Sequence, residues 1–337
     1  MIRKFLAVTC MSAFLFAGVQ PAVFAAGIQE PPAANDDGTR KALAAVAGAG
    51  MMETHTYEYL EELSDDIGAR VTGSPEAAQA EAWGVQKMKD MGLENVHLES
   101  WQLFRGWTRI SASADLIAPI HRRLMIDSMG WVGSTSAGGV DGEVVPVNAF
   151  QLADEMKNNA GKWRGKILLT VQRGEKPADS FGTFAKFGDF LRAAHEAGAL
   201  AVIGGQGGRP STGMHLTHTG ILGFDAYFEI PVVSMAAEDQ EQLERYLDRG
   251  TDVRLHIDVQ NRVTDGPVAS ANVVGEIRGT EHPEQIVVVG GHLDSWDLAT
   301  GSTDNGCGAS TTLGAAEAIL KSGMKPLRTI RFILFTG

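Results

Sequence analysis

The apolar run 287–289, followed at once by Gly290-Gly291, constrains the fold more than any other feature of this chain. An apolar run that ends in a glycine pair is typical of a buried strand in a parallel sheet, which helices cover on both faces. In open α/β sheets, ligands bind just beyond the carboxyl ends of such strands. His292 stands at that end, so the sequence predicts a ligand-binding histidine at the edge of a parallel sheet.

The pattern that follows His292 predicts a strand, a loop, a helix and a second strand. Apolar residues at helical spacing indicate a helix over about 307–322, and the apolar run 327–335 indicates the second strand. Two parallel strands joined by a helix form a right-handed crossover. The loop between the first strand and the helix then lies at the carboxyl edge of the sheet, where ligands bind.

Three carboxylates, Asp294, Asp297 and Asp304, lie close after His292. A neutral imidazole nitrogen can bind a metal, while Asp294 or Asp297 could accept the hydrogen of the other ring nitrogen and so fix the tautomer. Asp304 could supply an oxygen ligand. Clustered carboxylates repel one another unless a cation compensates them. We therefore predict half of a metal site, in preference to a histidine that is hydrogen-bonded only within its own loop.

The chain stops at Thr336-Gly337, directly after the second predicted strand. A domain seldom ends on a buried strand with no further element to cover it. We therefore expect a C-terminally truncated fragment of a longer protein, with the other half of the metal site beyond residue 337.

The formal net charge of −12 argues against a nucleic-acid partner, because proteins that bind phosphate backbones normally carry a basic excess. Residues 1–25 combine Arg3 and Lys4 with an apolar stretch and small residues, which predicts a signal peptide and a secreted or periplasmic protein. A membrane anchor is the alternative, but the stretch is short for a span. After cleavage we expect no membrane segment, and Cys307 remains as a lone cysteine without an intrachain disulfide. The oligomeric state stays open.

The fold class predicted is α/β, with a mostly parallel sheet and flanking helices interrupted by a β-rich α/β insert. The first domain would comprise 26–127, including one helix over about 39–63 and another that starts at Ser74. Short apolar runs split by glycines mark 128–265 as the insert. Residues 266–337 would return to the first domain.

Two other groups invite functional interpretations that we consider weaker. His215 and His218 have the spacing of a zinc pair, but no helix is evident there, so we interpret them as surface loop residues. Cys307 near a helix start could be a nucleophile, yet it lacks an obvious base. Trp101 and Phe104 are interpreted as packing residues.

The sequence Gly-His-Leu-Asp-Ser-Trp-Asp at 291–297, with Ser-Thr-Asp-Asn-Gly at 302–306, resembles the secreted co-catalytic zinc exopeptidases. That family includes bacterial aminopeptidases and carboxypeptidase Q-like enzymes, and the motif at 291–297 is most similar to that of the latter. Residues 70–75 resemble the N-terminal segment of that branch, and the insert resembles its protease-associated domain. The resemblance covers most of the mature chain.

The resemblance implies a zinc-exopeptidase-like fold with two zinc ions per complete site. His292 would bind one zinc and Asp304 would bridge both, while Asp294 would serve catalysis by orienting His292. In the family, Thr-Gly at the end of the next strand precedes two glutamates, the general base and a further ligand. Because these would follow Gly337, we expect this polypeptide to be inactive by itself.

Two functions from different classes follow. The first is a metal-dependent exopeptidase of the aminopeptidase or dipeptidase type, which hydrolyses peptides with a zinc-activated water. The alternative is a secreted binding module with a degenerate metal site. The joint presence of His292, Asp294 and Asp304 favours the enzyme. We expect the residues that decide specificity to lie largely beyond 337.

Overall fold

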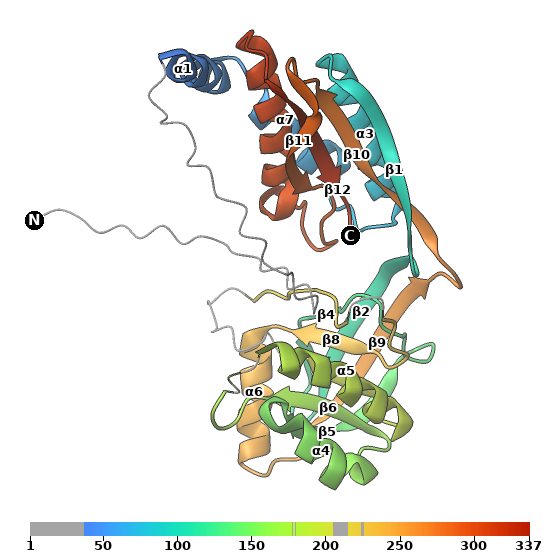
Figure 1. Cartoon of the computed structure of the whole chain (residues 1–337). Helices are drawn as coiled ribbons and strands as arrows, with labels where there is room; N and C mark the ends of the chain where they lie inside the picture. Colours follow the sequence, from blue (N-terminus) through green and yellow to red (C-terminus); the bar gives the residue numbers. More distant parts are fainter. Residues whose placement is uncertain (1–36, 177, 179, 205–214, 224–225) are drawn as a thin grey trace, which may run out of the picture.

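The computed structural model describes residues 37–176, 178, 180–204, 215–223 and 226–337. These residues form two lobes, each built on its own β-sheet (Figure 1). The C-terminal residue lies between the two lobes in this view.

The first lobe, at the top of Figure 1, holds a four-stranded sheet in the order β1-β10-β12-β11. Its strands are β1 (Glu94–Leu103), β10 (Val268–Ile277), β11 (His282–His292) and β12 (Arg328–Phe335). Its helices are α1 (Asp37–Met52), α2 (Thr56–Glu61), η1 (Glu62–Ile67), α3 (Pro75–Asp90), η4 (Ser302–Gly306) and α7 (Cys307–Lys321). Side chains of α3, α7, β10 and β12 share one hydrophobic core, so both helices cover the same face of the sheet.

The predicted strand–helix–strand crossover is confirmed, because β11 and β12 flank α7 and pair in parallel, with His292 opposite Phe335. The α/β class is confirmed as well. The sheet is mixed, however, where we expected it to be mostly parallel: β10 pairs antiparallel with both β1 and β12. The reason is that the chain leaves this lobe along β1 and returns along β10, which brings the two strands together in opposite directions (Figure 1).

Strand β11 is more exposed than a buried parallel strand should be. Val287 is 46% exposed and Val288 is 60% exposed. In the described part of the chain, β11 is the edge of the sheet and has β12 as its one neighbour. The expectation of a buried strand is therefore wrong for the described residues, whereas the position of His292 at its carboxyl end is confirmed.

The helix predicted over 39–63 is divided, with α1 ending at Met52 and α2 beginning at Thr56. The backbone N–H of His55 donates to Oε2 of Glu317 at 2.8 Å, so a tertiary contact with α7 takes the place of a helical hydrogen bond. The predicted start of α3 is confirmed: the Ser74 hydroxyl accepts a hydrogen bond from the backbone N–H of Ala77 at 3.1 Å.

The second lobe holds an eight-stranded sheet in the order β3-β2-β9-β5-β6-β7-β8-β4. Its strands are β2 (Trp107–Ala118), β3 (Arg122–Leu124), β4 (Ile126–Ser128), β5 (Val140–Asn148), β6 (Lys166–Val171), β7 (Ala201–Gly204), β8 (Val232–Met235) and β9 (Arg254–Val263). Its helices are η2 (Ala149–Gln151), α4 (Leu152–Asn159), η3 (Ala160–Lys162), α5 (Ser180–Glu196) and α6 (Ala237–Asp248). Strands β5 to β8 pair in parallel. Strand β9 lies between β5 and β2 and pairs antiparallel with both.

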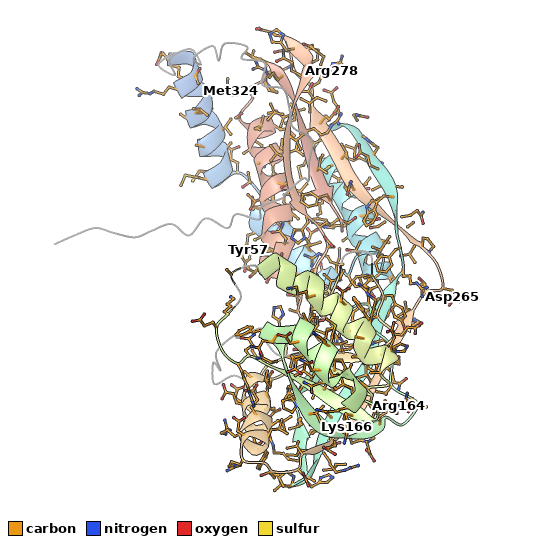
Figure 2. The ribbon with its side chains drawn as sticks, turned by 60° about the horizontal axis from the view of Figure 1, so that its bottom comes forward. Tyr57, Arg164, Lys166, Asp265, Arg278 and Met324 are labelled. Atoms are coloured by element: carbon orange, nitrogen blue, oxygen red, sulfur yellow. The ribbon has the colours of Figure 1, made fainter. Side chains whose placement is uncertain are left out.

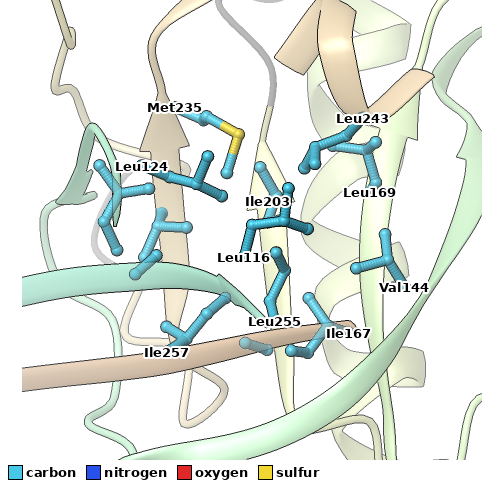
Figure 3. Close-up of a cluster of buried hydrophobic side chains, with 14 of the residues drawn as sticks. Leu116, Leu124, Val144, Ile167, Leu169, Ile203, Met235, Leu243, Leu255 and Ile257 are labelled. Carbon is cyan, nitrogen blue, oxygen red and sulfur yellow. The ribbon is translucent and has the colours of Figure 1, made fainter. Parts of the chain in front are cut away.

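Two hydrophobic cores lie on opposite faces of this sheet. Alternate residues of β6 separate into them: Ile167 and Leu169 enter one core, and Leu168 enters the other. Helix α6 covers the first core through Leu243, which Figure 3 shows together with Leu169 and Ile203. Helices α4 and α5 cover the second.

The eight-stranded sheet begins before residue 128, where we placed the start of the insert. Strands β2, β3 and β4 all lie within it, and β2 pairs with β9 along almost its whole length. The chain crosses between the lobes twice, from β1 to β2 and back from β9 to β10 (Figure 1). Asp265 lies on the second of them and is labelled at the side of the molecule in Figure 2.

Among the described helices, none has both the length and the apolar character that a membrane span requires. The predicted signal peptide, 1–25, lies outside the described residues.

Candidate metal centre and active site

His292 occupies the last position of β11, where the strand passes beneath the start of α7. The preceding Gly291 makes this approach possible, because a Cβ atom there would lie 2.6 Å from the backbone carbon of Gly308. The glycine pair recognised in the sequence therefore allows the helix to pack directly on the strand end. The loop between His292 and α7 is held at the edge of the sheet.

The structure brings the three predicted site residues together. His292 Nδ1 lies 3.2 Å from Asp294 Oδ1, and His292 Nε2 lies 3.0 Å from Asp304 Oδ1. Each ring nitrogen thus faces one carboxylate. Asp304 is 78% exposed and Asp294 is 19% exposed, so the first carboxylate faces the open side of the site and the second lies behind the ring. The peptide bond between Asp304 and Asn305 is cis.

Asp294, not Asp297, is the carboxylate that faces Nδ1 of His292, which decides between the two alternatives left by the sequence. Burial opposes ionisation of Asp294, but hydrogen bonds from His292 and Thr72 outweigh it and hold the pKa of this carboxyl below its ordinary value. The hydrogen bond to Asp294 raises the pKa of His292 against the effect of burial. Asp294 is therefore a fixed anion that orients the ring.

Thr72 and Gly337 hold the other oxygen of Asp294. The Thr72 hydroxyl donates to Oδ2, and the backbone N–H of Gly337 lies 3.3 Å from the same atom. Thr72 belongs to the segment 70–75, which the sequence analysis recognised only as a resemblance. Its contact with Asp294 gives that segment a physical role.

Arg70 is fully buried and fixes the loop that follows His292. Its guanidinium donates to the carbonyl of Leu293 at 2.6 Å, of Thr300 at 2.7 Å and of Gly301 at 3.0 Å. Burial lowers the pKa of Arg70 to about 10, so it stays charged at neutral pH. The sequence reasoning missed this role, because nothing local distinguishes Arg70 from a surface arginine. These three carbonyl groups lie more than 200 positions away in the chain, and Arg70 also donates to the nearby carbonyl of Gly68 at 2.7 Å.

Asp297 serves the contact between the lobes. It forms an ion pair with Arg109 of β2 at 2.7 Å, and both side chains are largely buried. Arg109 also donates to the carbonyl of Ser128 and, at 3.1 Å, to the hydroxyl of Thr219. The loop that carries Asp294 and Asp304 is thereby tied to the eight-stranded sheet.

Of the two weaker candidates, the histidine pair lies in the second lobe, whereas Cys307 begins α7 directly after the segment that carries Asp304. His215 Nε2 lies 2.7 Å from Asp239 of α6, in the second lobe. The backbone N–H of His218 donates to the Ser234 hydroxyl at 3.2 Å. The thiol of Cys307 donates to the carbonyl of Thr303 at 3.0 Å. These partners do not form a zinc pair or a nucleophile with its base.

The donors at the site suit a zinc ion. Zinc in proteins takes imidazole nitrogen and carboxylate oxygen ligands, and His292 Nε2 and Asp304 Oδ1 are adjacent and open to solvent on one side. Asp294 supplies the carboxylate that a metal-binding histidine usually has at its other nitrogen. Within the described residues, no group of three or more His, Cys, Asp or Glu side chains is arranged to hold a metal.

Comparison with known proteins identifies the relationship. The model of peptidase family M28 matches residues 272–337, which include all three site residues. Carboxypeptidase Q of Mus musculus is 32% identical over 306 residues, covering 90% of this chain and 63% of that protein. Residues 272–337 thus match peptidase family M28, and the chain is similar to carboxypeptidase Q over most of its length. Human carboxypeptidase Q is likewise 32% identical, over 88% of the chain and 61% of that protein. The chain thus spans less than two thirds of the length of these relatives.

Solved structures of two peptidases share the fold. The M28 peptidase precursor from Shewanella amazonensis has a TM-score of 0.76 at 26% identity, over 88% of this chain and 67% of that chain. A zinc aminopeptidase from Bacillus subtilis has a TM-score of 0.61 at 23% identity, over 84% of this chain and 61% of that chain. The second likeness shows the fold alone.

Proposed function

We propose that the protein to which this chain belongs is a zinc-dependent exopeptidase of the aminopeptidase or dipeptidase type. The observation that carries the proposal is the placement of His292 between Asp294 and Asp304 at the carboxyl end of β11. The match of residues 272–337 to peptidase family M28 and the likeness to carboxypeptidase Q support it. Peptides are the proposed substrates, and a secreted or periplasmic location follows if 1–25 is a signal peptide.

In this proposal His292 and Asp304 would hold zinc, with two ions in the complete site. Bound zinc would lower the pKa of a water molecule and polarise the scissile carbonyl. Asp294 accepts the hydrogen bond of His292 Nδ1, so that Nε2 is presented to the metal as a lone-pair donor. Arg70 and Thr72 hold the backbone and the carboxylate of this loop in place. These residues prearrange the site.

We further propose that residues 1–337 by themselves bind zinc weakly and are inactive. A catalytic zinc normally has three protein ligands and one open position, whereas the described residues offer His292 and Asp304 at this place. Isothermal titration of this chain with zinc tests the proposal. A sub-micromolar dissociation constant would contradict it.

Hydrolysis of short peptides by the full-length protein tests the main proposal. Activity should disappear with a chelator and return with zinc, and Asp304→Asn should reduce kcat/KM by roughly a thousandfold or more, because the carboxylate charge holds the metal. Asp265→Asn is the matched control, since Asp265 lies on the connection between β9 and β10 (Figure 2). Chelator-resistant activity, or zinc binding without any hydrolysis, would contradict the proposal. The second result would favour the binding module.

A further inference from the structure

The loop that follows His292, residues 293–301, is held from both lobes, and we call it the site loop. The guanidinium of Arg70, in the first lobe, donates to carbonyl groups near both ends of the loop. The middle of the loop, at Trp296 and Asp297, contacts the second lobe. The position of the site loop therefore depends on both lobes.

Arg109 of β2 is already fixed within the second lobe before it meets the site loop. Its guanidinium donates to the carbonyl of Ser128 and, at 3.1 Å, to the hydroxyl of Thr219. Its Nη1 lies 3.7 Å from Oδ1 of Asp127. These contacts set the orientation of the planar guanidinium, so little side-chain freedom is lost when it pairs with Asp297.

Trp296, the neighbour of Asp297 in the chain, adds an apolar contact with the second lobe. Its ring centroid lies 6.2 Å from that of Trp131, and the two ring planes are inclined at 76°. A Cβ atom at Gly130 would lie 3.1 Å from the Trp296 ring, so the glycine lets the indole pack close to the backbone of the second lobe. An ion pair and an aromatic contact thus hold two consecutive residues of the site loop.

The two carboxylates that face His292 lie on either side of Asp297 in the sequence. Asp294 comes before it and approaches Nδ1 of the imidazole, and Asp304 comes after it and approaches Nε2. A shift of Asp297 would therefore move both carboxylates relative to the ring. Metal sites tolerate errors of only roughly 0.2 Å in ligand distance, so the position of Asp297 matters for the whole donor set.

We propose that Arg109 is a positioning residue of the metal site, which acts through Asp297 and makes zinc binding depend on the contact between the lobes. The inference rests on the proposed function for the identity of the metal, and it adds a residue of the second lobe to that site. Linkage makes the effect reciprocal. Whatever factor the ion pair contributes to zinc affinity, bound zinc contributes to the stability of the ion pair.

The first experiment measures the zinc dissociation constant of the full-length protein by competition with a chromophoric chelator. Arg109→Met and Asp297→Asn should each raise this constant roughly tenfold, at the lower end of the range for lost partners of metal ligands. The double variant should raise it no further than either single variant, because both changes remove the same contact. An unchanged constant in folded Arg109→Met, or additive effects in the double variant, would overturn the inference.

Two further variants separate positioning from general stabilisation. Arg109→Lys keeps the charge but loses the two-point contact, so its zinc dissociation constant should lie between those of the wild type and Arg109→Met. Arg123→Met is the matched control, because Arg123 belongs to the same sheet and is 64% exposed. It should bind zinc as the wild type does.

Thermal unfolding checks that each variant is folded. If Arg109→Met does not fold, Arg109→Lys and Asp297→Asn carry the test. A purely structural role for Arg109 would lower the unfolding temperature of these variants and leave the zinc affinity of the folded protein unchanged. That result would overturn the inference.

The second experiment measures the hydrolysis of dipeptides with zinc in excess. Arg109→Met should lower kcat roughly three- to tenfold and leave KM within about twofold, because the lost contact positions metal ligands and not the substrate. An effect on KM alone would overturn the inference.

The two experiments also separate the inference from the proposed function. A wild type that hydrolyses dipeptides with zinc, beside an Arg109→Met variant with the same zinc affinity and kcat, would overturn the inference and leave the proposed function standing. A wild type that binds zinc without hydrolysis would overturn the proposed function, and the comparison of dissociation constants would still decide the role of Arg109. A wild type that binds no zinc would overturn both.

Discussion

Arg109 and Asp297 join the two lobes through a two-point ion pair, with Nε 2.7 Å from Oδ2 and Nη2 3.0 Å from Oδ1. Arg109 comes from the eight-stranded sheet, and Asp297 lies on the loop that also carries Asp294 and Asp304. A planar guanidinium that meets a carboxylate at two points fixes orientation as well as distance. The arrangement of the lobes and the geometry of the site are thereby coupled.

A double-mutant cycle with Arg109→Met and Asp297→Asn should show a coupling energy of about 1–3 kcal/mol in urea unfolding, because both side chains are largely buried. The more exposed pair Arg123 and Asp115 is the control, at 64% and 25% exposure. It should give less than about 1 kcal/mol. Equal coupling energies in the two cycles would show that the Arg109 pair has no special role.

Arg70→Met should lower the free energy of unfolding by about 3 kcal/mol or more, because it leaves buried carbonyl groups without donors. Arg70→Lys should recover only part of the loss, since an ammonium cannot reproduce the fork of the guanidinium. Equilibrium unfolding measures both. The exposed Arg164, labelled in Figure 2, provides the control Arg164→Met, which should change stability by less than about 0.5 kcal/mol.

Asp294→Asn in the full-length protein should reduce kcat/KM by roughly 10- to 100-fold, as is typical when a metal-binding histidine loses its carboxylate partner. Thr72→Val removes one hydrogen bond to Asp294 and should have a smaller effect in the same direction. Steady-state kinetics with zinc in excess measures both. Cys307→Ser should leave kcat/KM nearly unchanged. An inactive Cys307→Ser variant, together with wild-type activity that resists a chelator, would indicate a thiol hydrolase.

Glu317 should make stability depend on pH. Burial opposes its ionisation, but hydrogen bonds from His55, Lys321 and Tyr59 outweigh it and lower the pKa of the folded carboxyl. The unfolded chain therefore binds this proton at a higher pH, near the ordinary value of about 4.3. The stabilisation is complete above that value and is lost as the pH falls through the lower, folded pKa.

Urea unfolding of the wild type and of Glu317→Gln between pH 7 and pH 3 measures this contribution. The variant should be less stable at pH 7 and should lose less stability in acid. Glu281→Gln, at an exposed position, should follow the wild type. Parallel curves for Glu317→Gln and the wild type would show that Glu317 is not the group responsible.

Residues 107–263 should fold alone with a cooperative thermal transition, because the eight-stranded sheet and both of its cores lie within them. The shorter segment 128–265 lacks β2 and β3, which leaves β9 without its main partner. It should unfold at a lower temperature or aggregate. Circular dichroism on both segments decides where the boundary lies, and equal stability would favour residue 128.

Several of these features could be read from local patterns. The glycine pair before His292, the helix over about 307–322 and the strand that follows it are determined by neighbouring residues, and the structure agrees. Ser74 with Pro75 marked the start of α3 for the same reason. His292 lies close to Asp294 and Asp304 because the end of β11 and the loop that follows it carry all three, and their role as a metal site stays a prediction.

Other features depend on contacts between segments that lie far apart in the sequence, and local patterns do not reveal such contacts. The sequence offered Asp294 and Asp297 as equal partners for His292. The choice came from Thr72, which holds Asp294, and from Arg109, which binds Asp297 188 positions away. The mixed sheet likewise follows from the return of the chain along β10. The residues of β10 themselves do not indicate that it pairs antiparallel with its neighbours.

The donors and their order follow from local sequence: His292 at a strand end, with carboxylates at Asp294 and Asp304 in the loop that follows. The groups that hold this loop, and the residues beside it, depend on the folding of distant segments against one another. Arg70 reaches its carbonyl groups, and Trp131 meets Trp296, across large separations in the chain. Hydrophobic packing and buried hydrogen bonds depend on the distance between groups in space, and this distance cannot be deduced from the spacing of residues along the sequence.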